Sequence, residues 1–154
     1  MATIAKQTGK KPDDRLEMCA DNLQEGQRLG PVFYVVGSDQ IKAFASALRS
    51  RNPLYLDDDG VAPPTMRLLD YSLLIATHFK GGKGGVHAKH RCDFIEPLRV
   101  GQAVRVEGTV TSIQRRRGKF FFTLEYETRD ANSNQLLVRQ AITSILLSRE
   151  GAMS

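Results

Sequence analysis

An almost wholly apolar helix in the middle of the chain constrains the fold more than any other sequence feature. Residues 64–80 begin at proline, end just before a run of glycines and leave no wide polar face. A helix of this composition has to be buried. At roughly 25 Å it is short for a membrane span, and Arg67, Asp70 and His78 interrupt it. We therefore expect protein, not lipid, to surround this helix.

The segment before this helix predicts one strand and a second helix. Residues 32–36 are a compact β-branched and aromatic run bounded by glycines, which is typical of a strand. Ser38 offers an N-cap for a helix that ends near Arg49. Four apolar side chains recur at helical spacing and predict a face that packs on the sheet: Ile41, Phe44, Ala45 and Leu48.

Four strands are predicted after the glycine run. Residues 88–94, 104–110 and 120–127 alternate apolar and polar side chains, which is typical of half-buried strands. Residues 136–147 are apolar on both faces, which indicates a strand covered by another sheet or by a second subunit. One strand, two helices and four strands give an α+β order. A homodimer or higher oligomer is the expected assembly.

The length and composition fit one globular domain. A chain of 154 residues with 41% hydrophobic and 25% charged residues is ordinary for such a domain. We expect the domain over residues 26–150, an N-terminal tail or arm over 1–25 and a short tail over 151–154. Within the arm, residues 13–25 could form a short helix or lie on a neighbouring molecule. The net charge of +5 fits several kinds of partner and selects none.

No metal site, disulfide or export signal is predicted. Cys19 and Cys92 lie far apart, without the paired spacing of a zinc site or a disulfide framework. No pair of the three histidines has a metal-ligand spacing. The N-terminus lacks the apolar core of a signal peptide, so we expect a cytoplasmic protein.

Three motifs in a fixed order give the chain a family resemblance. Asn-Pro-Leu-Tyr at 52–55 and Ala-Pro-Pro-Thr at 62–65 stand between the two predicted helices, and Phe-Ile-Glu-Pro at 94–97 ends a later strand. In this order, residues 26–150 resemble the MaoC-like hydratases and dehydratases. The resemblance implies a hot-dog fold, in which a curled antiparallel β-sheet wraps around a long central α-helix.

The same resemblance implies chemistry on acyl thioesters. Members of the family interconvert a 3-hydroxyacyl thioester and its trans-2-enoyl form, without a redox cofactor or metal. In the hydratases, the Asp and His of an Asp-x-Asn-Pro-Leu-His motif activate one water. Backbone N–H groups at the start of the central helix hold the thioester oxygen. The matching amides here belong to Thr65 and Met66.

This chain departs from the family motif at both proton carriers. Asn52 matches, but Ser50 stands in place of the Asp and Tyr55 in place of the His. A tyrosine hydroxyl of ordinary pKa, near ~10, is a weak base at neutral pH. Tyr55 is therefore either a hydroxyl donor to substrate or water, or a packing residue in an inactive site. Ser50 and Asn52 are candidate substrate contacts, and His87 is the second catalytic candidate.

The other polar candidates have structural interpretations. His90 shares strand parity with apolar residues and His78 lies at the helix end, so both are interpreted as structural. Asp70 would be the carboxylate that a hot-dog thioesterase uses, but an ion pair with Arg67 at i, i+3 is favoured. The acidic residues 57–59 are interpreted as a solvated turn.

The densest basic cluster, residues 115–119, lies at a predicted hairpin. Arg117 and Lys119 could contact the phosphates of coenzyme A or of a carrier-protein arm. The alternative is a solvated hairpin tip. A nucleic-acid site needs exposed aromatic side chains beside the charge, and the alternation places Phe120 and Phe122 in the core. Nucleic acid is therefore not an expected partner.

Three functions follow from these residues and from the resemblance. The leading hypothesis is an acyl-thioester hydratase or dehydratase, which is a hydro-lyase. The second is a non-catalytic acyl-binding subunit of a heteromeric dehydratase, whose hot-dog partner carries the Asp and His. The third is a thioesterase that depends on Asp70.

Overall fold

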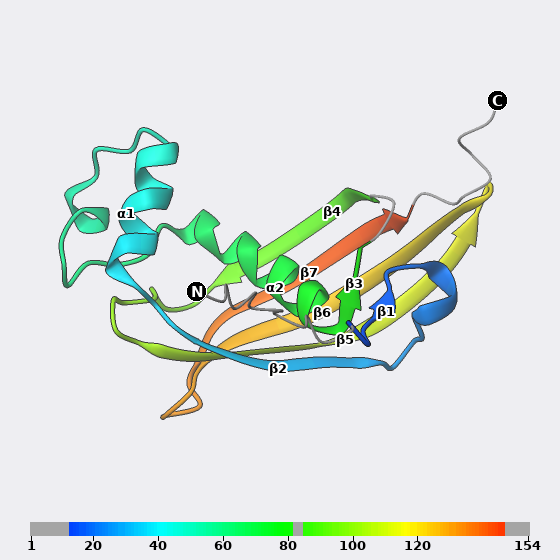
Figure 1. Ribbon diagram of the computed structural model, residues 1–154. Coiled ribbons are helices and arrows are strands. Elements are labelled where there is room, and N and C mark those ends of the chain that lie inside the picture. Colours follow the sequence, from blue (N-terminus) through cyan, green and yellow to red (C-terminus); the bar gives the residue numbers. More distant parts are fainter. Residues whose placement is uncertain (1–12, 82–84, 147–154) are drawn as a thin grey trace, which may run out of the picture.

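The fold is a five-stranded antiparallel sheet that curls around one helix (Figure 1). The computed structural model describes residues 13–81 and 85–146, so the predicted tail at 151–154 lies outside the described residues. The spatial order of the strands is β2-β5-β6-β7-β4, which makes β2 and β4 the edges. The predicted α+β hot-dog fold is confirmed. The strands are β2 (Arg28–Val35), β4 (Gly85–Phe94), β5 (Ala103–Arg116), β6 (Lys119–Asp130) and β7 (Leu136–Leu146).

The predicted hairpin between β5 and β6 forms where the sequence placed it. Arg117 and Gly118 have φ angles of 49° and 71°, as a two-residue turn between right-twisted strands requires. Both strands are longer than predicted, and their paired register continues to Arg116 opposite Lys119. The prediction ended β5 early because its last residues, Arg115 and Arg116, are exposed and carry no apolar alternation.

The central helix is shorter than the predicted span of residues 64–80. It begins as a 3-10 segment, η3 (Pro64–Leu68), and continues as α2 (Leu69–His78). The backbone then becomes extended and forms β3 (Phe79–Lys80), which pairs in parallel with β1 (Leu16–Glu17). Pairing with the N-terminal segment therefore ends the helix before the glycines are reached.

Helix α2 is buried on one face only. Tyr71 and Leu74 are 8% and 0% exposed and belong to the main core cluster between helix and sheet. Leu68 and Leu69, by contrast, are 45% and 50% exposed. The expectation of burial all round is therefore wrong for the single chain. Within residues 13–81 and 85–146, no helix is long and apolar enough to cross a membrane.

Helix α1 (Ser38–Ala47) lies beyond one end of the sheet and not on its face (Figure 1). Ile41 joins a second buried cluster near the start of the central helix, whereas Leu48 is 55% exposed. The N-cap is Gly37, so the predicted cap at Ser38 is wrong. Helix α1 therefore covers the end of the core and only part of its apolar stripe is buried.

The N-terminal segment packs on its own chain. Instead of a helix it forms β1 and a short 3-10 turn, η1 (Ala20–Asn22). Met18 and Leu23 are buried in the main core cluster. Arg15 donates a hydrogen bond to the backbone carbonyl of Ala76, at the end of α2 where the helix dipole favours a cation. The described part of the arm therefore packs against α2 and the main core cluster of the same chain.

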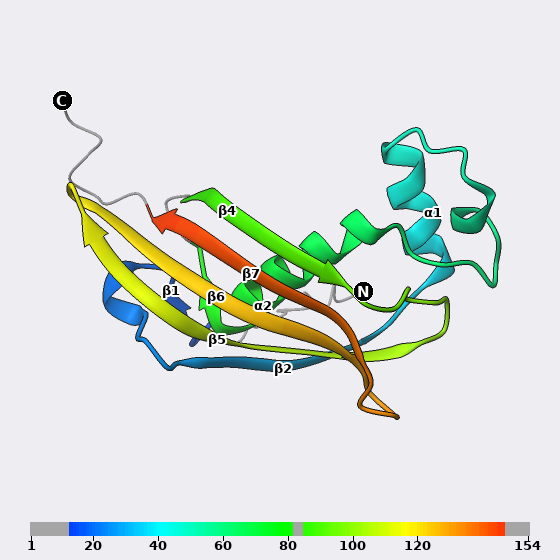
Figure 2. The same cartoon turned by 180° about the vertical axis from the view of Figure 1, so that it is seen from behind.

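The outer face of the sheet carries polar side chains on its central strands and the exposed apolar side chains of Phe33 and Val35 on β2. Figure 2 shows the fold from behind. On β7, Thr143 shares a hydrogen bond of 2.9 Å with Thr123 of β6. Arg139 donates to Glu127 over 3.1 Å. The inner face of β7 is buried against the helix, and Ile142 is 1% exposed. The prediction that both faces of this strand are buried is therefore wrong for the single chain.

One pair of substitutions tests the one-sided burial of α2. Leu74→Ala removes a fully buried side chain, so we expect a loss of about 2–5 kcal/mol in the free energy of unfolding. Leu69→Ala on the exposed side of the same helix is the matched control, with an expected change within about 0.5 kcal/mol. Urea denaturation followed by circular dichroism measures both. Equal losses would contradict the packing described.

Candidate active site

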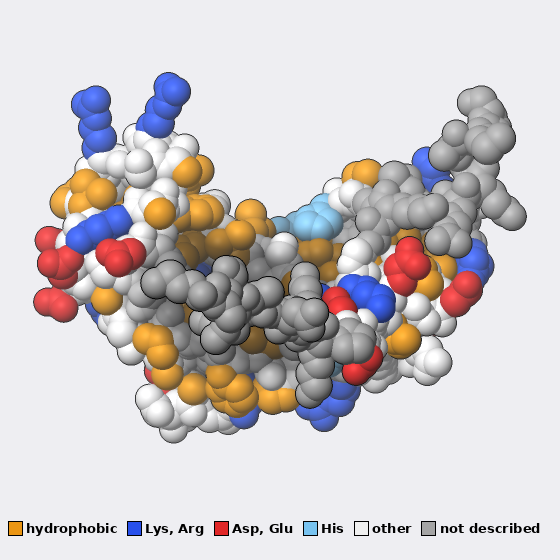
Figure 3. All heavy atoms as spheres, in the orientation of Figure 1, with side chains coloured by type: hydrophobic (Ala, Val, Ile, Leu, Met, Phe, Trp, Pro, Cys, Tyr) orange, Lys and Arg blue, Asp and Glu red, His pale blue; other side chains and the backbone are white. Residues whose placement is uncertain are grey.

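An apolar groove of about 290 Å³ lies at the start of the central helix. It is formed where the loop after α1, the Pro-Pro segment and the chain following β4 meet. Figure 3 shows hydrophobic side chains gathered on this concave side of the molecule. We call it the apolar groove. Its lining residues are Leu54, Tyr55, Val61, Ala62, Pro63, Pro64, Arg67, Phe94, Ile95, Glu96, Pro97, Leu98 and Val138.

The Asn-Pro-Leu-Tyr motif forms a 3-10 turn, η2 (Pro53–Tyr55), on the groove wall. The side chain of Asn52 accepts a hydrogen bond of 3.1 Å from the Leu54 N–H. The hydroxyl of Ser50 accepts one of 3.3 Å from the Asn52 N–H. Both side chains therefore hold the local backbone. Tyr55 is half-buried and lines the groove, so it is the motif residue placed to meet a ligand.

The loop after Tyr55 is closed tightly on the turn. A Cβ atom at Gly60 would lie 2.2 Å from the backbone oxygen of Leu54, so a side chain there is excluded. The N–H of Val61 donates to that same oxygen over 2.9 Å. The three acidic residues 57–59 are exposed, and Asp58 pairs with Lys42. The predicted solvated turn is confirmed.

One backbone amide remains as a candidate donor at the helix start. The Met66 N–H donates to the Pro63 oxygen over 2.9 Å. This amide, predicted to hold the thioester oxygen, is therefore already used within the 3-10 turn. The Thr65 N–H takes part in none of the hydrogen bonds found within the described residues. It lies directly after Pro64, which lines the groove. Thr65 is therefore the amide that a ligand oxygen could reach.

A buried polar cluster lies beneath the groove and joins the helix to β2 and β6. The hydroxyl of Tyr34 donates to Asp70 over 2.8 Å, and Thr128 donates to the other carboxylate oxygen over 2.7 Å. Arg67 donates to the Tyr34 hydroxyl and lies 3.7 Å from Asp70. Arg67 and Asp70 are each 2% exposed. The predicted ion pair is confirmed, and we call these four residues the Arg67–Asp70 cluster.

Burial dominates the electrostatics of this cluster. It raises the pKa of Asp70 above its ordinary value, although Arg67 and the two hydroxyl donors oppose the shift. Burial, with the nearby Asp70 charge, also raises the pKa of Tyr34. Tyr34 is therefore a neutral hydrogen-bond donor at physiological pH. The cluster contains the one cation among the groove-lining residues, Arg67.

Two histidines on the edge strand β4 face the helix. His90 shares a hydrogen bond of 3.1 Å with Gln140, whose amide donates to the Arg67 carbonyl oxygen over 3.2 Å. The ring of His87 packs edge-on against Tyr71 with centroids 4.7 Å apart. A register shift between His87 and Lys89 allows both histidines onto one face. His90 is more exposed than the half-buried sheet residue predicted from its strand parity.

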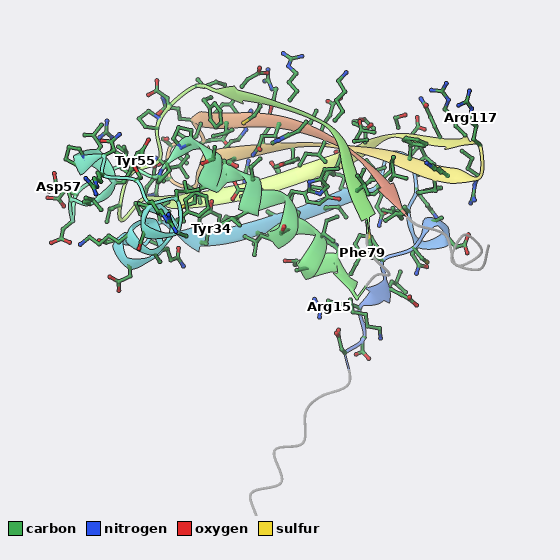
Figure 4. All side chains as sticks on the ribbon, turned by 90° about the horizontal axis from the view of Figure 1, so that it is seen from above. Arg15, Tyr34, Tyr55, Asp57, Phe79 and Arg117 are labelled. Carbon is green, nitrogen blue, oxygen red and sulfur yellow. The ribbon has the colours of Figure 1, made fainter. Side chains whose placement is uncertain are left out.

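The structure does not bring the predicted catalytic pair together within one chain. Tyr55 lies beside Phe94 in the groove. His87 precedes Phe94 by seven positions along β4, which is roughly 20 Å at the rise of a strand. Arg117 marks the far end of the molecule from Tyr55 (Figure 4). Arg117 and Lys119 therefore cannot contact a ligand in the same chain's groove at close range.

The remaining titratable candidates have structural contacts. The Nε2 atom of His78 accepts a hydrogen bond of 2.7 Å from the Gly30 N–H, as the structural interpretation of this residue expects. Burial raises the pKa of the Cys92 thiol to about 11. Cys92 and Cys19 are both free thiols. Among the described residues, no cluster of side chains could hold a metal ion.

Comparison with known proteins identifies the family. A family described as "Thioesterase superfamily" matches residues 65–131. The (R)-specific enoyl-CoA hydratase of Aeromonas caviae is 32% identical over 107 residues, which cover 63% of this chain and 78% of that protein. The chain belongs to the MaoC-like (R)-hydratase and dehydratase family. The resemblance drawn from the sequence motifs is confirmed.

Solved structures of this family have the same fold. The (R)-hydratase of Aeromonas caviae involved in PHA biosynthesis aligns with a TM-score of 0.69 at 24% identity, covering 83% of this chain and all of that one. HadBC, a 3R-hydroxyacyl-ACP dehydratase complex of Mycobacterium tuberculosis, aligns with a TM-score of 0.69 at 20% identity, covering 79% and 96%. A MaoC-like dehydratase of Rhodospirillum rubrum aligns at 0.68 and 20%, covering 84% and 97%.

The raised pKa of Asp70 predicts how stability depends on pH. The folded state holds this proton more tightly than the unfolded chain, so Asp70 contributes less stability as pH rises from about 3.8 through its folded pKa. As pH rises through this window, the free energy of unfolding of Asp70→Asn should therefore increase relative to that of the wild type. Urea unfolding at several pH values between acid and neutral measures the difference.

Asp58→Asn is the matched control for this experiment. The Lys42 ammonium lowers the pKa of Asp58, so the wild type should gain stability over Asp58→Asn as pH rises towards 3.8. The two variants should therefore show opposite slopes against pH. A slope of the same sign for both would contradict the account of the buried carboxylate.

Proposed function

We propose that the protein reversibly hydrates a trans-2-enoyl thioester to the 3-hydroxyacyl thioester. The observation that carries the proposal is the apolar groove, which has Tyr55 on its wall and Pro64, directly before the Thr65 amide, at the helix start. An acyl chain suits the apolar lining. The thioester oxygen accepts from the Thr65 N–H, at a helix N-terminus whose dipole favours the developing negative charge.

The hydration step needs a water and two proton transfers. The water oxygen bonds to C3 while one water proton leaves to a base, and a proton is returned to C2. Tyr55 orients the water through its hydroxyl, and His87 is the base. No redox cofactor or metal is required by this chemistry, in which coenzyme A or a carrier protein holds the acyl group.

A homodimer would bring His87 to Tyr55. Strand β4 is an edge, and Val86 and Phe94 near its two ends are 52% and 53% exposed. Exposed edge strands pair readily with another chain. In an antiparallel β4–β4 pair, the end that carries His87 in one copy meets the end that carries Phe94 in the other. Each groove would then hold Tyr55 of one copy and His87 of its partner.

A second candidate function rests on the altered motif. Ser50 and Asn52 hold the backbone, and the motif offers Tyr55 where the family's hydratases have His. In this reading, the chain is a non-catalytic acyl-binding subunit, and a hot-dog partner supplies Asp and His. HadBC is a precedent for a dehydratase complex in the family. Co-purification of a second hot-dog chain would support it.

The thioesterase reading is weaker. It would use Asp70, but both carboxylate oxygens accept hydrogen bonds from buried hydroxyls, on Tyr34 and Thr128. A carboxylate engaged in this way is a poor nucleophile or base. An assay for free thiol after incubation with acyl-coenzyme A separates this reading from hydration, because only hydrolysis releases thiol.

Removing the Tyr55 hydroxyl tests its role. Tyr55→Phe keeps the ring that lines the groove, so binding of a saturated acyl thioester should persist while hydration falls about 10²–10⁴-fold. Mass spectrometry of enoyl thioesters, scored for the gain of one water, measures hydration. Undiminished hydration would show that the reaction does not need the Tyr55 hydroxyl. If the wild type binds the acyl thioester but does not hydrate it, the non-catalytic acyl-binding subunit is favoured.

Mixing two variants tests the shared site. Tyr55→Phe and His87→Gln should each be nearly inactive as homodimers. Co-expressed with different affinity tags, they should form a heterodimer with one intact groove and recover part of the wild-type activity. The control is each variant co-expressed with a tagged copy of itself. Absence of recovery in a purified heterodimer would contradict the contribution of His87 from the partner.

A further inference from the structure

The guanidinium of Arg67 has unused hydrogen-bonding capacity. Arginine carries five N–H donors. Among the described residues, its guanidinium makes one hydrogen bond, from Nη1 to the Tyr34 hydroxyl. Its Nε atom is buried and has no acceptor. A buried donor without a partner costs free energy, so such an atom calls for an acceptor that the chain itself does not provide.

The counter-charge of Arg67 is only loosely engaged. Asp70 lies 3.7 Å from Nη1, which is longer than a hydrogen bond. The two oxygens of Asp70 are instead occupied by hydroxyl donors on Tyr34 and Thr128. Asp70 therefore does not depend on Arg67 for its hydrogen bonds. The edge of the guanidinium that contains Nε has no acceptor among the described residues.

The shape of this free edge indicates the chemistry of the acceptor. The Nε–H and a neighbouring Nη–H of arginine point in parallel and bind the two oxygens of a carboxylate together. Arg67 lines the apolar groove, where its neighbours Pro63, Pro64 and Leu98 carry no polar side chain. The one carboxylate of the lining, Glu96, is exposed, whereas Arg67 is buried. Because Arg67 is the buried charge of the lining and Glu96 the exposed one, a negative charge on an otherwise apolar ligand is favoured beside Arg67.

We propose that the groove takes acyl thioesters whose acyl chain carries a carboxylate, and that Arg67 binds this carboxylate. This inference rests on the proposed binding of an acyl thioester and specifies its substrate class. Arg67 follows Thr65 by two residues in the same helical segment. The carboxylate therefore binds close to the thioester carbonyl, and the acyl chain is short.

A pair of saturated thioesters tests the inference without any reaction. Glutaryl-coenzyme A and pentanoyl-coenzyme A differ only in a terminal carboxylate in place of a methyl group. The wild type should bind the glutaryl thioester about tenfold to a hundredfold more tightly, as expected for hydrogen bonds to a charged group. Isothermal titration calorimetry measures both affinities.

Variants of Arg67 assign the preference to this side chain. Arg67→Met should abolish the preference. Arg67→Lys should reduce it, because lysine keeps the charge but lacks the two parallel N–H donors of the guanidinium. Arg67→Met combined with Asp70→Asn leaves no lone buried charge and serves if the single variant does not fold. Arg99→Met is the matched control. Arg99 is exposed and follows the groove residue Leu98, and its loss should keep the preference.

The outcomes separate this inference from the proposed function. Equal binding of both thioesters by the wild type would refute the carboxylate preference and leave thioester binding standing. A preference that survives in a folded Arg67→Met variant would refute the role of Arg67. Binding of neither thioester would refute the proposed function together with the inference.

Discussion

The position of the central helix in the sheet depends on the Arg67–Asp70 cluster. Apolar contacts are non-directional, so a helix of this composition could rotate or slide within the concave sheet at small cost. The hydrogen bonds that Asp70 accepts from Tyr34 and Thr128 join the helix to β2 and β6. The bond from Gln140 to the Arg67 carbonyl joins the helical segment to β7. These contacts specify one register. The groove and the Thr65 amide are placed by that same register.

Most of the fold could be predicted because its strands obey local rules. Alternation predicted the inner faces of β5 and β6, and Arg117-Gly118 predicted the hairpin turn. The end of the helix could not be predicted, since β3 forms there only because a distant segment, β1, pairs with it. The exposure of Leu69 could not be predicted from composition either, because a single sheet covers only one side of a helix.

The site was predictable where motifs are local and not where partners are remote. The Asn-Pro-Leu-Tyr and Pro-Pro-Thr segments do meet at the groove. Spacing alone indicated the Arg67–Asp70 pair, but its partners Tyr34 and Thr128 come from strands far away in sequence. The 3-10 turn that occupies the Met66 amide leaves no sequence signal. The direction of the β5–β6 hairpin, which carries Arg117 away from the groove, also depends on the assembled sheet (Figure 4).

The extra residue at Ala88 lies in an edge strand, where a change of length affects the pairing with one neighbour only. Because the register shifts between His87 and Lys89, deleting Ala88 would remove the bulge while His87 stays opposite Ser144. His90 and Cys92 would keep their orientation. Strand β4 has a neighbour on one side only, so such a change in length would leave the rest of the sheet paired. Insertions and deletions at this point could therefore reshape the exposed edge of the sheet while its core stays paired.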